Sequence, residues 1–439
     1  MTIPDALWTH PMACACGRTH VVPIEAVVVA EDALAQLQHF VEARGFQRIL
    51  VVADVNTWAV LGEAVVEALA PSQPHMALQV FPHRQDLRPD EEAVARIRTA
   101  IATAEATVAI AVGSGVINDL VRYATDRERI PYVAVPTAPS MDGYASAVAA
   151  MQFQGVKVTF PAHAPIGIFT QPHVLAEAPA ALIRSGFGDL MGKVIALADW
   201  KLAHRFYGEY FCEFSYQLMQ GALQASVRQV TGLQAQEPEA VGELFAGLII
   251  SGLAMAFVGN SRPASGSEHH CSHYWDFLAY SGQRPHTAHG VQVGYATQWA
   301  MDLYRVLLTL PALRQPVMPV LDGSWEEAMA KEYGGGAPAV IAQQQEKRRW
   351  LTERTAFWAP DLGGLITALQ PEWQAFDEIE QALDRLGMPH QPGAFGIPPA
   401  MLAQTLEHAH ELRSRYTILD CLSGQGRRTE SIQQILGVL

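Results

Sequence analysis

Residues 108–120 read Val-Ala-Ile-Ala-Val-Gly-Ser-Gly-Val-Ile-Asn-Asp-Leu, an apolar run followed by a Gly-Ser-Gly turn and an amphipathic stretch. The run predicts a buried strand, and the residues after the turn predict a helix. Glycines at such a turn let the backbone approach a pyrophosphate, and the following helix N-terminus offers N–H groups to its oxygens. The segment favours nucleotide binding. A plain strand-to-helix turn is the alternative, because the full G-x-G-x-x-G spacing is absent.

Similar runs rich in valine and isoleucine occur at residues 26–30, 49–53 and 132–135, separated by amphipathic stretches at 32–44, 57–69 and 90–104. Apolar strands that alternate with helices indicate a parallel sheet covered on both faces. We expect residues 1–180 to form a Rossmann-like, NAD(P)-binding α/β domain. Long helical patterns dominate after that point, so we expect residues 181–439 to form an all-α domain. The aspartate and histidines considered below make it the expected metal- and substrate-binding domain. The boundary is expected between Pro172 and Gly186.

Composition narrows the class of protein. The 439 residues are 49% hydrophobic and carry a net charge of -14, from 44 acidic and 30 basic residues, so a nucleic-acid partner is not expected. The sequence contains no run of 18 consecutive apolar residues, so a membrane span is not expected. Residues 1–16 lack the pattern of a secretory signal. The five cysteines form an odd, scattered set rather than a disulfide framework, which favours the reducing cytoplasm.

Asp54 follows the predicted strand at residues 49–53. An acid at the end of a strand in such a domain can accept hydrogen bonds from the adenosine ribose, which would favour NAD over NADP. A helix cap before Thr57 is the equal alternative, since aspartate is common in both roles.

The segment at residues 261–273 reads Ser-Arg-Pro-Ala-Ser-Gly-Ser-Glu-His-His-Cys-Ser-His. His269 and His273 are four residues apart, on one face of a predicted helix. His289 precedes another helical pattern, and Asp189 is expected to open a third helix. An aspartate and two histidines would form an open, three-ligand site of the kind that catalytic divalent metals use. For each histidine alone, a capping or core-edge role is the alternative.

Cys14, Cys16 and His20 lie close together near the N-terminus. Their spacing is short, and only three metal ligands are visible where a structural zinc site needs four. A buried or surface loop is therefore the favoured interpretation.

Five motifs carry a resemblance to the sn-glycerol-1-phosphate dehydrogenase family, including its bacterial branch. They are GSGVINDL (113–120), IPYVAVPTAPSMDGYAS (130–146), GFGDLMGKVIALADWKLA (186–203), SRPASGSEHHCSH (261–273) and HGVQVG (289–294). That family is grouped with glycerol dehydrogenases, iron-type alcohol dehydrogenases and dehydroquinate synthases. This sequence departs from the family pattern where Gly-Ser-Gly replaces Gly-Gly-Gly. The extra His270 could also shift the ligand register by one.

The resemblance implies site residues by motif position. The cofactor would be bound by Gly113, Ser114, Gly115, Val116, Ile117, Thr137, Ser140 and Ser146. The metal would be held by Asp189, His269 and His289. The substrate would be contacted by Asp142, Asp189 and His273, which form the expected catalytic set. Arg262 and Lys157 are our candidates for a substrate phosphate, with ion pairs as the alternative role.

The implied reaction is NAD(P)H-dependent reduction of dihydroxyacetone phosphate to sn-glycerol 1-phosphate, within phospholipid metabolism. A divalent metal would act as Lewis acid. Zinc is favoured, and the oxygen and nitrogen ligands leave nickel or ferrous iron open. Alternatives are another small phospho- or phosphono-ketone or a polyol as substrate, a dehydroquinate-synthase-type lyase, and a non-catalytic nucleotide-binding protein. A homo-oligomer, dimer or larger, is also expected.

Overall fold

The computed structural model describes residues 7, 10–71, 75–82, 87–153, 156–314, 316, 320–358 and 361–437, with only the backbone described at 156 and 157. The chain divides into two compact units. Unit 1 comprises Met1–Leu190 and Phe214–Ser261, and unit 2 comprises Met191–Glu213 and Arg262–Leu439. Helix α7 (Ala180–Tyr207) is continuous through the division between Leu190 and Met191. The predicted division of function, with the cofactor bound by residues 1–180 and the metal and substrate by residues 181–439, stays a prediction.

Unit 1 contains a six-stranded sheet in the order β3-β10-β7-β6-β4-β5, and every neighbouring pair in it is parallel. The predicted parallel α/β fold is confirmed. Four of its strands coincide with the predicted apolar runs, whereas β5 and β10 were not predicted. The strands are β3 (Ala26–Val29), β4 (Ile49–Asp54), β5 (Met76–Phe81), β6 (Val108–Val112), β7 (Tyr132–Val135) and β10 (Gly167–Thr170).

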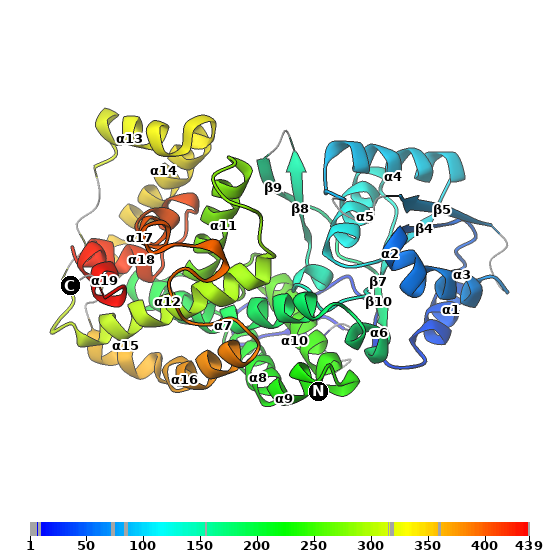
Figure 1. Ribbon diagram of the computed structural model, residues 1–439, viewed down its shortest axis with the longest axis horizontal. Coiled ribbons are helices and arrows are strands. Elements are labelled where there is room, and N and C mark those ends of the chain that lie inside the picture. Colours follow the sequence, from blue (N-terminus) through cyan, green and yellow to red (C-terminus); the bar gives the residue numbers. More distant parts are fainter. Residues whose placement is uncertain are drawn as a thin grey trace. The chain divides into compact units, whose positions relative to one another are not determined.

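Helices cover both faces of this sheet (Figure 1). Helices α4 (Glu91–Ala104) and α5 (Gly115–Glu128) contact β4, β5, β6 and β7, while α1 (Ala33–Ala43) contacts β3 and β10. The segment α2 (Val55–Thr57), η2 (Trp58–Gly62) and α3 (Glu63–Leu69) lies beside α1. Buried aliphatic side chains such as Leu37, Val51, Val65 and Ile110 fill the space between the layers. Burial of this apolar surface is the main stabilising contribution to unit 1.

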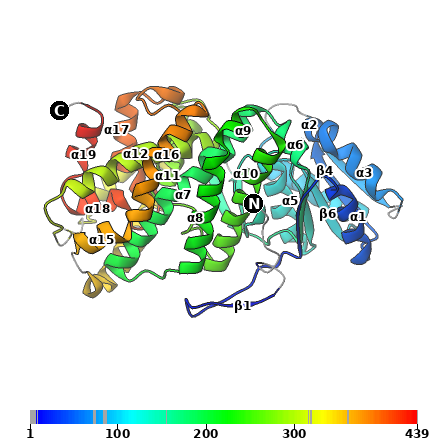
Figure 2. The ribbon, with the colours of Figure 1, turned by 90° about the horizontal axis from the view of Figure 1, so that it is seen from below.

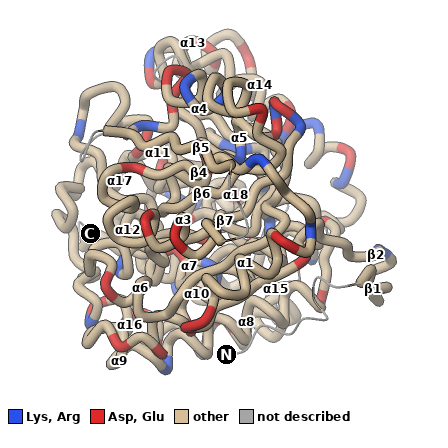
Figure 3. The backbone as a smooth tube through the Cα atoms, turned by 90° about the vertical axis from the view of Figure 1, so that its right-hand side faces the viewer, with Lys and Arg blue, Asp and Glu red and all other residues tan. Residues whose placement is uncertain are grey.

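Unit 1 also contains two hairpins and several helical elements outside the six-stranded sheet. Strands β8 (Val148–Phe153) and β9 (Val156–Pro161) form an antiparallel hairpin, as do β1 (Met12–Ala13) and β2 (Thr19–His20). The β1–β2 hairpin lies apart from the six-stranded sheet in two views (Figures 2 and 3). The helical elements are η3 (Gly143–Ala145), α6 (Pro172–Ala176), α8 (Glu213–Arg228), α9 (Val230–Gln234) and α10 (Pro238–Val258).

Helix α10 is the one described helix long and apolar enough to cross a membrane, but most of it is buried inside the fold. Such burial is typical of a core helix, which passes the same test of length and composition.

Unit 2 is helical in its described residues, as predicted. Helix α12 contacts α11, α16, α18 and α19, so it forms the centre of this unit. The α-helices are α11 (Ser267–Tyr280), α12 (His289–Thr309), α13 (Gly323–Tyr333), α14 (Ala337–Glu353), α15 (Leu362–Ala368), α16 (Gln370–Arg385), α17 (Pro399–His408), α18 (Ile418–Gly424) and α19 (Arg428–Ile435). The 3-10 turns are η4 (Gly334–Gly336), η5 (Thr355–Phe357), η6 (Ala394–Gly396) and η7 (Ala409–Leu412).

A buried carboxylate anchors the start of α11 in unit 2. Asp199 accepts hydrogen bonds from the N–H groups of Ser267 (2.6 Å) and Ile418 (2.7 Å) and from the Tyr304 hydroxyl (2.7 Å). Burial, followed by the nearby charge of Glu268, raises the pKa of Asp199 to about 6. These bonds fix the helix end that carries His269.

Candidate active site

The glycine turn lies at the carboxyl end of β6, where Gly113 and Ser114 lead into α5. A Cβ at Gly113 would lie 2.7 Å from the Cβ of Ile117, so a side chain there would displace the helix. The Gly113 carbonyl accepts a 3.4 Å hydrogen bond from the N–H of Thr137, which follows the neighbouring strand β7. The structure therefore brings these predicted cofactor residues together beside the first-turn N–H groups of α5, which are suited to an anion.

Asp54 ends β4 and caps the next helix. Its Oδ1 accepts hydrogen bonds from the N–H groups of Asn56 (2.8 Å) and Thr57 (2.9 Å). This is the cap that the sequence offered as the alternative to ribose binding. A contact between Asp54 and the ribose stays a prediction.

Arg122 on α5 is fully buried and holds the loop that carries Ser146. Its guanidinium donates to the carbonyl oxygens of Tyr144 (2.9 Å) and Val148 (2.7 Å) and to Ser146 Oγ (3.3 Å), and it pairs with Asp119 at 3.0 Å. A buried cation persists only when its donors are satisfied, so these bonds fix the loop conformation. Sequence reasoning missed Arg122; the available signal was a single cation on the apolar face of a predicted helix.

A close approach between α7 and the loop after β7 positions the next site residue. Ser185 Oγ donates a 3.0 Å hydrogen bond to the carbonyl of Ser140. A Cβ at Gly186 would lie 1.7 Å from the Pro139 carbonyl oxygen, so this position in the Gly-Phe-Gly-Asp motif requires glycine. Asp189 follows about one turn later on the same helix.

Asp142 and Asp189 are in contact within unit 1. The Asp142 N–H donates to Asp189 Oδ2 at 3.1 Å, and the Ser251 hydroxyl donates to Asp142 Oδ2 at 2.8 Å. The prediction that Asp189 opens a helix is wrong, because α7 begins at Ala180 and continues through it. Its carboxylate is fully buried and held by the loop from β7.

Asp189, His269 and His289 each offer a ligand atom, and these atoms all lie within 4.8 Å of one another. His269 lies in the first turn of α11, and α12 begins at His289. His270 is fully buried and is not part of this group, so the geometry favours the register with His269. One carboxylate and two imidazoles form a donor set that suits a catalytic divalent metal with an open coordination position.

Both histidine rings are oriented by neighbours in unit 2. His269 Nδ1 lies 2.7 Å from Glu268 Oε1, and His289 Nδ1 lies 3.1 Å from Ser272 Oγ. Ser272 Oγ also donates to Gln292 Oε1 at 3.2 Å, so it accepts from the histidine. These bonds place the proton of each ring on Nδ1 and leave Nε2 as the atom that can bind a metal. Residues that hydrogen-bond to metal-ligating histidines usually have this role.

His273 lies beside the two histidines but outside the three-residue group. Its ring centroid is 6.3 Å from that of His269 and 6.0 Å from that of His289. Arg413 donates a 3.0 Å hydrogen bond to its Nε2. Arg415 donates a 3.1 Å hydrogen bond to the Ser265 carbonyl. Burial, followed by the charges of Arg262 and Arg413, lowers its pKa to about 9, which leaves it a cation at neutral pH. Sequence reasoning missed both arginines, because neither lies in one of the five motifs that carry the resemblance.

The two predicted phosphate ligands have different outcomes. Arg262 is buried and donates to Glu209 Oε2 (2.8 Å) and to the carbonyls of Asp199 (3.2 Å) and Tyr416 (2.7 Å), the ion-pair role offered as the alternative. Lys157 lies in β9, but its side chain falls outside the described residues.

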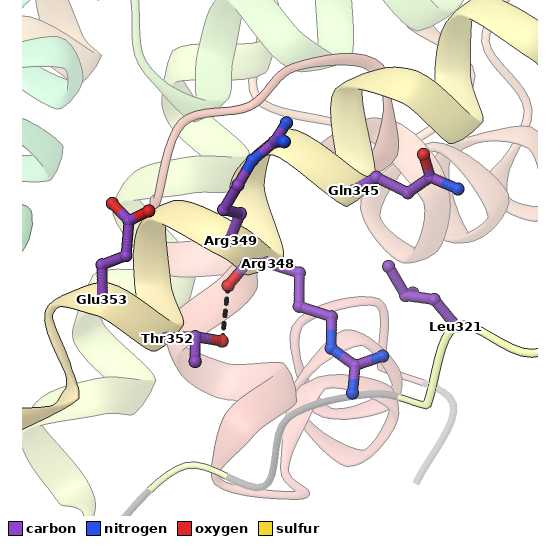
Figure 4. Close-up of a pocket in the computed structure, with 6 residues that line it drawn as sticks. All are labelled: Leu321, Gln345, Arg348, Arg349, Thr352 and Glu353. Atoms are coloured by element: carbon purple, nitrogen blue, oxygen red, sulfur yellow. Dashed lines mark hydrogen bonds between the residues drawn. The ribbon is translucent and has the colours of Figure 1, made fainter.

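An open hollow on unit 2 is separate from all predicted site residues (Figure 4). In it, Arg348 extends toward Leu321 while Arg349 points away, and Thr352 donates to the Arg348 carbonyl at 2.8 Å. Its two cations come from the surface of α14, and we assign it no role in the site.

Comparisons with known proteins agree with the fold and the motifs. Residues 28–179 match the family model of iron-containing alcohol dehydrogenases. The chain is 31% identical over 412 residues to glycerol-1-phosphate dehydrogenase [NAD(P)+] of Geobacillus stearothermophilus, covering 92% of this chain and 94% of that protein. The corresponding protein of Pyrococcus furiosus is 38% identical over 189 residues, 43% of this chain and 54% of that protein.

Solved structures resemble the fold at low sequence identity. A probable glycerol dehydrogenase from Sinorhizobium meliloti matches with a TM-score of 0.62 and 15% identity, over 94% of this chain and 97% of that chain. Sulfoacetaldehyde reductase from Bifidobacterium kashiwanohense, solved in complex with NAD+, matches with a TM-score of 0.60 and 14% identity, over 93% and 97%. These matches support the architecture alone.

Proposed function

Because the chain belongs to the glycerol-1-phosphate dehydrogenase family and is an NAD(P)-dependent oxidoreductase, we propose that it reduces dihydroxyacetone phosphate to sn-glycerol 1-phosphate. The reaction takes place in the cytoplasm and uses NADH or NADPH. The observation that carries this proposal is the group of Asp189, His269 and His289, whose ligand atoms lie within 4.8 Å of one another.

Asp189, His269 and His289 would hold the divalent metal. A metal bound there would supply Lewis-acid polarisation of the ketone oxygen, and the nicotinamide would supply hydride; such charge stabilisation contributes several kcal/mol. Glu268 and Ser272 keep the two rings in the ligand tautomer. The donor set admits zinc, nickel or ferrous iron.

The cofactor would lie along the turn at Gly113–Ile117, with Thr137, Ser140 and Ser146 at its side. Its pyrophosphate would accept hydrogen bonds from the first-turn N–H groups of α5. Arg122 acts on this region as a positioning residue, because it holds Ser146 and the adjacent backbone in place.

Asp142 and His273 would contact the substrate near the ketone. The hydrogen bond from Arg413 occupies Nε2 of His273 and leaves the ring proton on Nδ1, the atom that would exchange a proton with the product hydroxyl. Arg413 and Arg415 are the best-supported cations for the substrate phosphate, since Arg413 donates to His273 and the charge of Arg415 interacts with that of Arg413 within unit 2.

The test is consumption of NADH and NADPH with dihydroxyacetone phosphate, before and after treatment with a chelator. We expect turnover that stops on metal removal and returns when metal is restored, with sn-glycerol 1-phosphate as the product. A panel of dihydroxyacetone, phosphono-ketones and polyols separates the alternatives. The substrate assignment is wrong if the metal-replete protein reduces another ketone far better and leaves dihydroxyacetone phosphate unchanged.

A further inference from the structure

A second group of metal-ligating side chains lies at the N-terminal hairpin. Cys14, Cys16, His20 and Cys212 each offer a ligand atom, and the four atoms all lie within 4.8 Å of one another. The sequence showed three of them. The fourth, Cys212, precedes α8 and is distant in the sequence, so spacing alone could not supply it.

The hairpin turn brings the first three ligands to one side. Met12 pairs with His20 across β1 and β2, and the Gly17 N–H donates to the Cys14 carbonyl at 3.0 Å to close the turn. Gly17 has φ +84°, a left-handed conformation that glycine adopts without steric cost. A tight turn that carries two cysteines is thus followed at once by a strand that carries a histidine.

The distances suit zinc. Tetrahedral zinc with Zn–S of about 2.3 Å and Zn–N of about 2.0 Å separates a sulfur from a nitrogen ligand by about 3.5 Å and two sulfurs by about 3.8 Å. Cys16 Sγ lies 3.5 Å from His20 Nε2. The whole set is within 4.8 Å, so closing on one ion needs only small rotamer movements.

The His20 ring is already oriented for coordination through Nε2. Its Nδ1 lies 3.0 Å from the Phe257 carbonyl at the end of α10, which makes Nδ1 the protonated atom and leaves the Nε2 lone pair toward the cysteines. The rings of Phe214 and Phe257 lie 6.2 Å and 5.0 Å from the His20 ring. Arg18 secures the same hairpin through a 2.8 Å bond to the Val258 carbonyl.

Cys212 is held next to these residues by the chain itself. It is fully buried and lies two residues before Phe214, whose ring stacks on His20 within unit 1. A short link therefore joins its sulfur to Phe214, whose ring is stacked on His20.

We propose that Cys14, Cys16, His20 and Cys212 bind a structural zinc ion that ties the N-terminal hairpin to the segment before α8. Three thiolates and one imidazole fill all four tetrahedral positions, which leaves none for substrate. This soft donor set differs from the carboxylate and two imidazoles of the candidate active site, so the chain has two metal sites of different kinds. The zinc compensates for a hairpin that lies apart from the main sheet (Figure 2).

The first experiment measures metal content by mass spectrometry on full-length protein from zinc-replete cells. We expect two metal ions per chain in the wild type, one in C14S/C16S and one in D189N. Cys421→Ala, which removes a buried cysteine of α18 outside the group, should keep two. Wild-type content in C14S/C16S overturns the proposal. Loss only in C14S/C16S, with D189N unchanged, would instead contradict the active-site metal.

A second experiment keeps the test decisive if C14S/C16S does not fold. Wild type and D189N are reconstituted with cobalt in place of zinc, and both should show thiolate-to-cobalt charge-transfer absorption. X-ray absorption of zinc-loaded D189N should show a first shell dominated by sulfur. A shell of light atoms only, or a disulfide among Cys14, Cys16 and Cys212 in anaerobically purified protein, would overturn the proposal.

Discussion

The backbone N–H of Asp142 donates a 3.1 Å hydrogen bond to Oδ2 of Asp189, so the loop after β7 holds the carboxylate proposed as a metal ligand. The side chain of Asp142 has a different partner, because its Oδ2 accepts from the Ser251 hydroxyl at 2.8 Å. The main chain and the side chain of Asp142 therefore have different partners. A substitution that changes the side chain leaves the hydrogen bond from the main chain to Asp189 in place.

Asp142→Asn should keep the active-site metal, since the backbone N–H remains, but should lower kcat/KM by about 10²-fold as the proposed substrate contact is lost. Asp189→Asn should lose that metal and with it all measurable reduction. Metal content and initial rates measured on both variants decide the question. Loss of metal in Asp142→Asn would show that its carboxylate supports the metal site itself.

His289→Ala and His273→Ala should likewise differ in whether the active-site metal is retained. The first removes a proposed ligand and should release one metal ion per chain, whereas the second should retain the metal and lose about 10² to 10⁴ in kcat. Equal metal loss in the two variants would place His273 among the ligands. Titration with a chromophoric chelator gives the metal content, and unchanged circular dichroism serves as the control for folding.

Glu268→Gln should weaken metal binding by about 10- to 100-fold without removing a ligand. Glu268 Oε1 lies 2.7 Å from His269 Nδ1 and also accepts from the Gly266 N–H at 2.8 Å. A glutamine amide in place of the Glu268 carboxylate holds the His269 ring less firmly and makes the imidazole a weaker base. Competition with a chelator of known affinity measures the change, with Ser272→Ala as the matched variant behind His289. Wild-type affinity in both would argue against ring orientation as a determinant of binding.

Asp189, His269 and His289 could be singled out from the sequence because each lies in a motif that carries the family resemblance, and their role as metal ligands stays a prediction. Their supporting residues could not be predicted in the same way. Arg413 contacts His273, and Cys212 joins Cys14, through folding that brings distant segments together. A single sequence carries no record of such contacts.

The same limit explains the strands that were missed. Strand β10 enters the sheet between β3 and β7, and its partner Ala26 in β3 lies far earlier in the chain than Gly167. The run Gly-Ile-Phe-Thr is short and lacks the valine-rich pattern of β4 and β6. Its assignment depends on burial between two neighbouring strands, which only the folded chain reveals.

Arg413→Met and Arg415→Met should weaken use of the phosphorylated ketone specifically. Loss of a hydrogen bond to a charged group costs about 1.5–3 kcal/mol, or about a 10- to 150-fold fall in kcat/KM for dihydroxyacetone phosphate. Rates with unphosphorylated dihydroxyacetone should change little in Arg415→Met. In Arg413→Met they should fall less than the rates with the phosphorylated ketone, because this variant also removes the hydrogen bond to His273 Nε2. Arg262→Met is the contrasting variant: it should lower the melting temperature, because it leaves Glu209 without its 2.8 Å ion-pair partner. Equal losses on both substrates would remove the two arginines from phosphate binding.

His390→Gln should reduce the stability of unit 2 in a pH-dependent manner. His390 lies 3.1 Å from Asp302 and also contacts Glu380. Burial lowers its pKa, but the hydrogen bonds and charges of the two carboxylates outweigh burial and leave the pKa above its usual value of 6.5. The folded state therefore binds the proton more tightly than the unfolded chain. The stabilisation is complete below the pKa of the unfolded state and disappears as the pH rises through the pKa of the folded state.

Urea denaturation at about pH 5.5 and about pH 9 should show a larger difference in the free energy of unfolding between wild type and His390→Gln at the acidic pH. A difference that stays constant across this range, or grows toward alkaline pH, would mean that His390 contributes by packing against Trp299 rather than by its charge.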